Sequence, residues 1–180
     1  MDRATLEVFA ETIEHLLNAR ARVRPPADRS YAELLERAIR KVDEIAPLNV
    51  SRRAQDAADG LGLGDLRRFC WFCSPLSKHK VQRKRLFVWE HYEPVTQMRS
   101  AIERLEPPRG PAEIVAILER TKIVWIHRDE DDSLNEKDLK SVRPDAASAY
   151  RSADIHLVHQ WDECTTSICQ GHGRYQRRPL

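Results

Sequence analysis

Apolar residues in the first third of the chain recur at the spacing of three and four that is typical of an amphipathic helix. Those that fall on one face over residues 2–20 are Leu6, Phe9, Ile13, Leu16 and Leu17. A second helix is predicted from Ser30, with Glu33 completing a capping box, to Pro47. A third begins near Ser51 and ends at the glycine-rich GLGLG segment. The pattern therefore predicts an all-helical first third.

The pattern changes after residue 85. Three short runs rich in β-branched and aromatic residues are typical of strands, namely RLFVWEH at 85–91, TKIVWIH at 121–127 and DIHLVH at 154–159. Helical patterns lie at 95–105, 111–120 and 143–150. The polar stretch 128–141 is expected to be a loop that holds at most one short helix.

These elements predict an α+β fold, with a helical N-terminal third followed by a small mixed α/β core with two or three short strands. We expect a helical region (1–64), an α+β core with the candidate site (65–160) and a basic tail that contains Cys and His (161–180). The apolar fraction of 41% and the charged fraction of 32% are those of a folded globular chain and not of a disordered one.

Net charge and hydropathy limit the possible partners. The 30 basic and 28 acidic side chains give a formal charge of +2, so only local charge can indicate a polyanionic partner. The N-terminal segment MDRATLEVFAETIEHLL carries charges throughout, and no run of about 18 uncharged apolar residues occurs. We therefore expect no secretory signal, no membrane partner and a cytoplasmic location.

The four cysteines fall into two groups whose spacing favours metal binding. Cys70 and Cys73 form a C-x-x-C pair, which can place two thiolates on one tetrahedral zinc ion. Cys164, Cys169 and His172 could supply the remaining ligands if the two segments meet. The alternative is that the first pair, flanked by aromatic residues, packs as small hydrophobic side chains. A structural Zn²⁺ site is thus one of two interpretations.

A basic run precedes the first predicted strand. No acidic residue interrupts it, and its members are Arg67, Arg68, Lys78, Lys80, Arg83, Lys84 and Arg85. Lys and Arg side chains that neutralise phosphates release counterions from a nucleic-acid backbone, so the run predicts a DNA-contacting surface. The alternative is a solvated loop whose charge is offset by the acidic residues at 129–132.

Glu90 and His91 end the predicted strand, just before Pro94 and a helix. A His in this place can activate water, and the neighbouring acid can hold a divalent ion. The segment CWFC…WEHYEP at 70–94 resembles the HNH, or His-Me finger, nucleases. The resemblance implies that His91 is the general base and that Glu90 binds Mg²⁺ or a similar ion. His127 would join this site if the two strands pair, and the alternative for the pair is a local hydrogen-bond network.

These features together predict a metal-dependent endonuclease that hydrolyses DNA, and the resemblance suggests restriction or defence biology. Two alternatives remain open. One is a non-enzymatic nucleic-acid-binding or regulatory protein that uses the same basic run. The other is a protein-interaction module that forms a homodimer through its N-terminal helices. An acid-x-Lys pattern at 138–140 also fits a second class of metal-dependent nuclease, but its polar surroundings favour an acidic surface loop.

Overall fold

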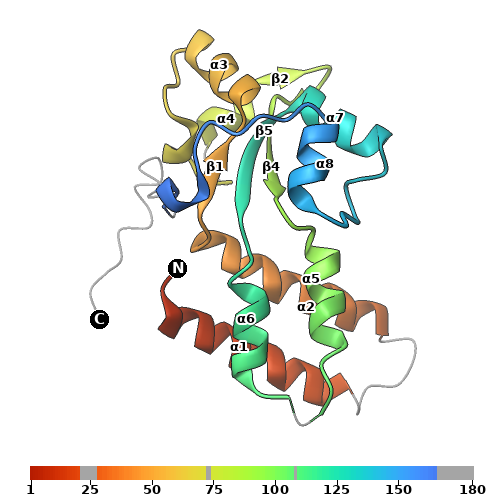
Figure 1. The fold of residues 1–180 in the computed structure, drawn as a ribbon. Coiled ribbons are helices and arrows are strands. Elements are labelled where there is room, and N and C mark those ends of the chain that lie inside the picture. The colour runs from red at the N-terminus through yellow and green to blue at the C-terminus, as the bar shows by residue number, and fades with distance from the viewer. Residues whose placement is uncertain (21–27, 72–73, 108, 166–180) are drawn as a thin grey trace.

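The computed structural model describes residues 1–20, 28–71, 74–107 and 109–165 (Figure 1). Its α-helices are α1 (Arg3–Arg20), α2 (Asp28–Arg40), α3 (Arg52–Gly60), α4 (Ser74–Lys78), α5 (Val95–Glu103), α6 (Pro111–Leu118), α7 (Arg128–Glu136) and α8 (Ala146–Ser152). Short 3₁₀ turns are η1 (Lys41–Glu44), η2 (Leu66–Arg68) and η3 (Trp161–Glu163). Its strands are β1 (Leu48–Val50), β2 (Lys80–Val81), β3 (Lys84–Arg85), β4 (Phe87–His91) and β5 (Ile123–His127). The predicted α+β fold is confirmed.

Three strands form a small mixed sheet in the order β1-β5-β4, and β2 and β3 form a separate hairpin. β1 is parallel to β5, and β4 is antiparallel to it, with Phe87 opposite His127 and His91 opposite Ile123. In Figure 1, β1 and β5 run from the helices at the bottom up to α3 and α7, whereas β4 runs down to α5. The carboxyl ends of β1 and β5 therefore lie at one end of the sheet, and the carboxyl end of β4 lies at the other.

Helices α1, α2, α5 and α6 form a layer at the lower end of the sheet (Figure 1). The apolar face of α1, represented by Leu6 and Ile13, is buried there. The same core contains Met98 of α5 and Ile114 of α6. Residues on both sides of position 64 thus share one core. The homodimer expected through the N-terminal helices stays a prediction.

Side chains alternate between the two faces of β5, as the pleat of a strand requires. Trp125 packs with Ala54 of α3 in one cluster. Val124 and Ile126 pack with Leu134 of α7 in another. Because both faces are covered by helices, the central strand is apolar at every position up to His127. The sheet is therefore a rigid support for the residues that follow its strands.

Two sequence-based expectations about the sheet are wrong. The first third is not all helical, because Leu48–Val50 forms β1, and a fully buried run of three residues shows no alternation that would reveal it. The expected strand at 154–159 does not form, and only Leu157 bridges, to Ser51. The polar stretch after His127 forms α7, a helix of nine residues. Among the described helices, none is long and apolar enough to cross a lipid bilayer.

Candidate functional site

The last part of the basic run, residues 80–85, forms the two-stranded hairpin of β2 and β3. Val81 lies opposite Lys84, so Gln82 and Arg83 alone connect the strands. Both have a positive φ, 49° and 67°, as the central residues of a type I′ turn must. Neither is glycine or asparagine, so each carries a conformational cost of about 1 kcal/mol. The tight, exposed turn presents its side chains to solvent.

We expect Gln82→Asn to raise the free energy of unfolding by about 0.5–1 kcal/mol, because asparagine adopts a positive φ at less cost than glutamine. The measurement is the urea midpoint at constant slope. Gln82→Ala is the control at the same site, since alanine lacks the short polar side chain that lets asparagine adopt a positive φ. An equal change in both variants would contradict the expectation.

Four basic side chains of the hairpin, Lys80, Arg83, Lys84 and Arg85, are exposed. Among the described residues, the one ion pair of these four side chains joins the Lys84 Nζ to the Asp132 Oδ1 at 3.8 Å. An exposed pair at that distance contributes little, so it leaves the charge of the hairpin largely uncompensated. The expected neutralisation by the acids at 129–132 is thus limited to this one weak contact among the described residues.

The other members of the basic run differ. Arg68 and Lys78 are exposed, but Arg67 is bound to Asp65, with its Nε and Nη2 both donating to that carboxylate at 2.9–3.2 Å. The side-chain hydrogen bond to Asp65 raises the pKa of Arg67, which keeps it charged but paired. Asp65 lies two residues before the run, so counting acids inside the run missed it. Arg67 thus differs from the hairpin residues in that its charge is already paired, and its role in binding phosphate stays a prediction.

A tryptophan cluster lies beside the hairpin. Trp125 is buried, its ring meets that of Trp89 edge-on at 4.9 Å, and its Nε1 donates to the Phe69 carbonyl at 3.1 Å. The Trp71 ring stacks on Trp125 at 6.3 Å with an interplanar angle of 26°. The Arg85 guanidinium lies over the Trp71 ring, 4.6 Å from its centre. An aromatic surface thus adjoins the basic hairpin.

Glu90, the expected metal ligand, is held in a buried ion pair. The Arg143 guanidinium donates to Glu90 Oε1 and also to the carbonyls of Leu139, His91 and Tyr92, at 2.6, 2.6 and 3.0 Å. Glu90 is 7% exposed and Arg143 is 2% exposed. A divalent ion on Glu90 would have to displace this guanidinium and leave it buried and unpaired. These residues therefore do not fit a Mg²⁺ site.

His91 and His127 lie at opposite ends of β4 and β5. The strands pair as expected, but the antiparallel register sets His127 opposite Phe87, four residues from His91. The His91 Nε2 lies 2.9 Å from the Asp43 Oδ1 of η1, and both side chains are mostly buried. The pair joins the sheet to the helical layer. Thus, of the three expected catalytic residues, His127 does not share a site with Glu90 and His91.

His127 caps the start of α7. Its Nδ1 accepts a hydrogen bond from the Asp129 amide at 3.2 Å. Burial lowers the pKa of His127, although the Asp129 carboxylate acts in the opposite direction. The ring is therefore neutral at pH 7, with Nδ1 as the acceptor. This capping role depends on the position of His127 at the junction of β5 and α7.

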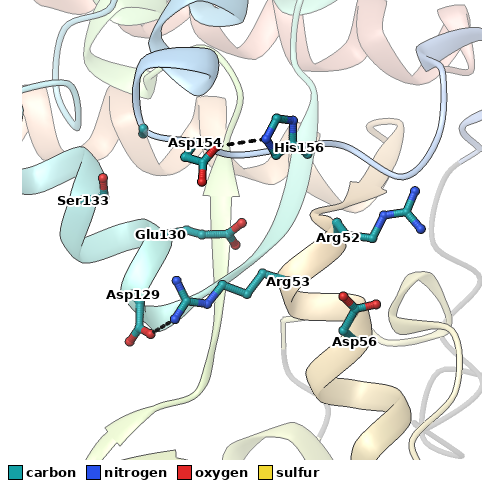
Figure 2. A pocket seen from close by; sticks show the side chains of 9 residues that line it. Arg52, Arg53, Asp56, Asp129, Glu130, Ser133, Asp154 and His156 are labelled. Carbon is teal, nitrogen blue, oxygen red and sulfur yellow. Dashed lines mark hydrogen bonds and ion pairs between the residues drawn. The ribbon is translucent and has the colours of Figure 1, made fainter.

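A polar pocket lies where β1 and β5 end and α3 and α7 begin. Its volume is ≈ 420 Å³, and its lining residues are Arg52, Arg53, Asp56, Asp129, Glu130, Ser133, Ala153, Asp154 and His156. Figure 2 shows Arg53 reaching from α3 to Asp129 of α7, while Asp154 pairs with His156 on the other rim. The edge beyond the carboxyl ends of parallel strands is a common place for a ligand.

Glu130 is the buried acid of this pocket, at 4% exposure, and points from α7 toward α3 (Figure 2). Its Oε2 accepts hydrogen bonds from the Ser51 hydroxyl at 2.5 Å and from the His127 amide at 2.7 Å. Burial raises the pKa of Glu130, and these hydrogen bonds and Arg53 offset only part of that effect. Sequence reasoning missed this residue because Ser51 was not seen to follow a strand.

The expected zinc ligands lie partly outside the described residues. Cys73, Cys169 and His172 are not described. Cys70 and Cys164 are half-buried, and burial raises the pKa of the Cys164 thiol while the nearby Arg67 acts in the opposite direction. Within the described part of the chain, no group of three or more His, Cys, Asp or Glu residues is placed to hold a metal ion. The zinc site stays a prediction.

Comparison of the chain with protein-family models, with curated proteins and with solved structures found no match.

Proposed function

We propose that this protein binds nucleic acid through the β2–β3 hairpin and that it does so without cleaving it. The observation that carries the proposal is the set of exposed basic side chains on that hairpin, Lys80, Arg83, Lys84 and Arg85. A compact group of this kind neutralises successive phosphates, which supplies most of sequence-independent affinity. The hairpin backbone is already ordered in the free protein. Binding of phosphates therefore costs less loop conformational entropy than it would on a disordered segment.

The arrangement of Glu90 and His91 favours binding over cleavage. The buried Arg143 guanidinium forms an ion pair with Glu90, and the mostly buried Asp43 carboxylate lies 2.9 Å from the His91 Nε2. A general base needs an accessible nitrogen within hydrogen-bond reach of a water, and a metal ligand needs an accessible carboxylate. Recruiting this pair for hydrolysis would break two buried contacts. Their role in the proposal is to join β4 to its neighbouring segments.

The test is fluorescence anisotropy with labelled DNA at several salt concentrations. In the variant Lys80→Gln, Arg83→Gln, Lys84→Gln, Arg85→Gln, we expect an affinity loss of at least about 100-fold near 0.1 M salt. The slope of log K against log[salt] should fall in magnitude by roughly 3, about 0.7 for each lost contact to a single strand. Unchanged affinity in this variant would refute the proposal.

The matched control removes four positive charges elsewhere. Arg29, Arg37, Arg40 and Arg104 are exposed and lie in the helical layer, at the opposite end of the sheet from the hairpin (Figure 1). We expect their combined change to glutamine to alter affinity less than about threefold, because charges beyond a Debye length are screened. A parallel assay tests cleavage of plasmid DNA with Mg²⁺ or Mn²⁺. Cutting that is lost in a folded His91→Ala variant would contradict binding without cleavage and would support the nuclease alternative.

A further inference from the structure

We infer that the nucleic acid bound at the hairpin is single-stranded, with an unpaired base stacked on the Trp71–Arg85 pair. This inference rests on the proposed function. Among the Phe, Tyr and Trp side chains that the structure describes, that of Trp71 is the most exposed, at 39%. It lies beside the basic hairpin and is contacted by one of the hairpin's own guanidinium groups. Because Trp125 and Arg85 both lie against the indole ring, the planar surface left for a base is the outer face of the exposed Arg85 guanidinium, which Trp71 supports from beneath.

The pair is held in position before any ligand arrives. Trp71 stacks on the buried Trp125, which is in turn fixed by its hydrogen bond to the Phe69 carbonyl. Arg85 belongs to β3, and its carbonyl accepts a hydrogen bond from the Arg128 side chain of α7 at 3.1 Å. Little conformational freedom is therefore lost when a base stacks on this surface, which favours binding.

The chemistry of the pair selects an unpaired base. Indole and guanidinium groups are both planar, and each stacks on the face of a nucleobase. In a duplex, both faces of each internal base are covered by its neighbours, so only an unpaired base is available. Stacking of one base on an aromatic side chain raises affinity by roughly 5- to 100-fold, whatever the base. The remaining charges, Lys80, Arg83 and Lys84, are left for the phosphates.

A different mode would insert the hairpin as a two-stranded ribbon into the major groove of a duplex. That mode uses the charges of the hairpin but brings no unpaired base onto the Trp71–Arg85 pair. The two modes therefore differ in their dependence on the planar group of Arg85. Lysine in its place keeps the charge and loses the plane, so this substitution separates stacking from charge.

The experiment measures anisotropy of the full chain with a labelled 15-nucleotide DNA strand, its duplex and inorganic polyphosphate as a competitor. We expect tighter binding to the strand than to the duplex. Arg85→Lys should weaken strand binding about fivefold and leave the duplex and polyphosphate within about twofold. Arg83→Lys is the matched control and should leave all three within twofold. Trp71→Leu, checked for folding by thermal unfolding, should weaken strand binding about tenfold.

The outcomes separate this inference from the proposed function. Equal effects of Arg85→Lys and Arg83→Lys, or a duplex bound as tightly as the strand, would overturn base stacking and leave binding by the hairpin intact. Loss of affinity for all three probes on Trp71→Leu in a folded protein would also count against stacking. If no probe binds the unsubstituted protein at low salt, the proposed function itself is wrong.

Discussion

Arg143→Ala is expected to lower the free energy of unfolding by about 3–5 kcal/mol, because it leaves the Glu90 carboxylate buried and unpaired. Arg143 is 2% exposed. Its guanidinium donates hydrogen bonds to Glu90 and to three carbonyls, and the substitution removes all of them. The measurement is urea unfolding followed by circular dichroism. A loss below 1 kcal/mol would show that Glu90 is solvated and open to other ligands.

The control adds Glu90→Gln to the same variant. If the cost arises from an unpaired buried charge, the double variant should regain at least about 1 kcal/mol relative to Arg143→Ala alone. Glu90→Gln by itself should be less costly than Arg143→Ala, because an amide oxygen still accepts from the guanidinium. A double variant as unstable as the sum of the two single ones would mean that the two residues do not interact.

This ion pair explains why the strand-end motif could not be interpreted from the sequence. Glu90 and His91 are adjacent in the chain, which suggested one shared chemical role. Their partners Arg143 and Asp43 lie 53 residues after and 48 residues before them. No local pattern reveals pairing over such distances. In a strand, adjacent side chains also point to opposite faces, so neighbours in sequence reach different partners.

Much of the fold followed from periodicity alone. The helices α1, α5 and α6 were predicted because each buries a face of three or more apolar residues against the others. The strands β4 and β5 were found from their β-branched and aromatic content. β1 was missed because its three residues are too few to show a period. Long amphipathic segments can therefore be predicted from the sequence. The secondary structure of a short buried segment is set by the elements packed around it, which the sequence does not identify.

The sequence predicted that the candidate site is basic, but it did not predict how its side chains are arranged. The basic run was visible as a stretch without acids, but the pairing of Arg67 with Asp65 depends on the turn that η2 makes. The contact between Arg85 and Trp71 joins residues fourteen apart across an irregular segment. The pocket around Glu130 requires β1 to be parallel to β5, which was not expected.

Glu130→Ala is expected to lower the free energy of unfolding by about 2–4 kcal/mol, because it leaves two buried donors without an acceptor. These donors are the Ser51 hydroxyl and the His127 amide, which both bind Glu130 Oε2. Glu130→Gln should cost less at pH 7, since its amide oxygen can accept both hydrogen bonds. Chemical denaturation at fixed pH measures both. Equal losses in the two variants would contradict the role of Glu130 as an acceptor.

The pH dependence of stability provides a second and independent result. Burial raises the pKa of Glu130 above its usual value of 4.5, so the folded state holds its proton more tightly than the unfolded state. The stability from this group is fully present below pH 4.5 and is lost as the pH rises through the folded-state pKa. Relative to Glu130→Gln, the unsubstituted protein should therefore lose unfolding free energy as the pH increases. Glu136→Gln, an exposed site on the same helix, should show no such trend, and a trend of opposite sign at Glu130 would mean that its hydrogen bonds outweigh burial.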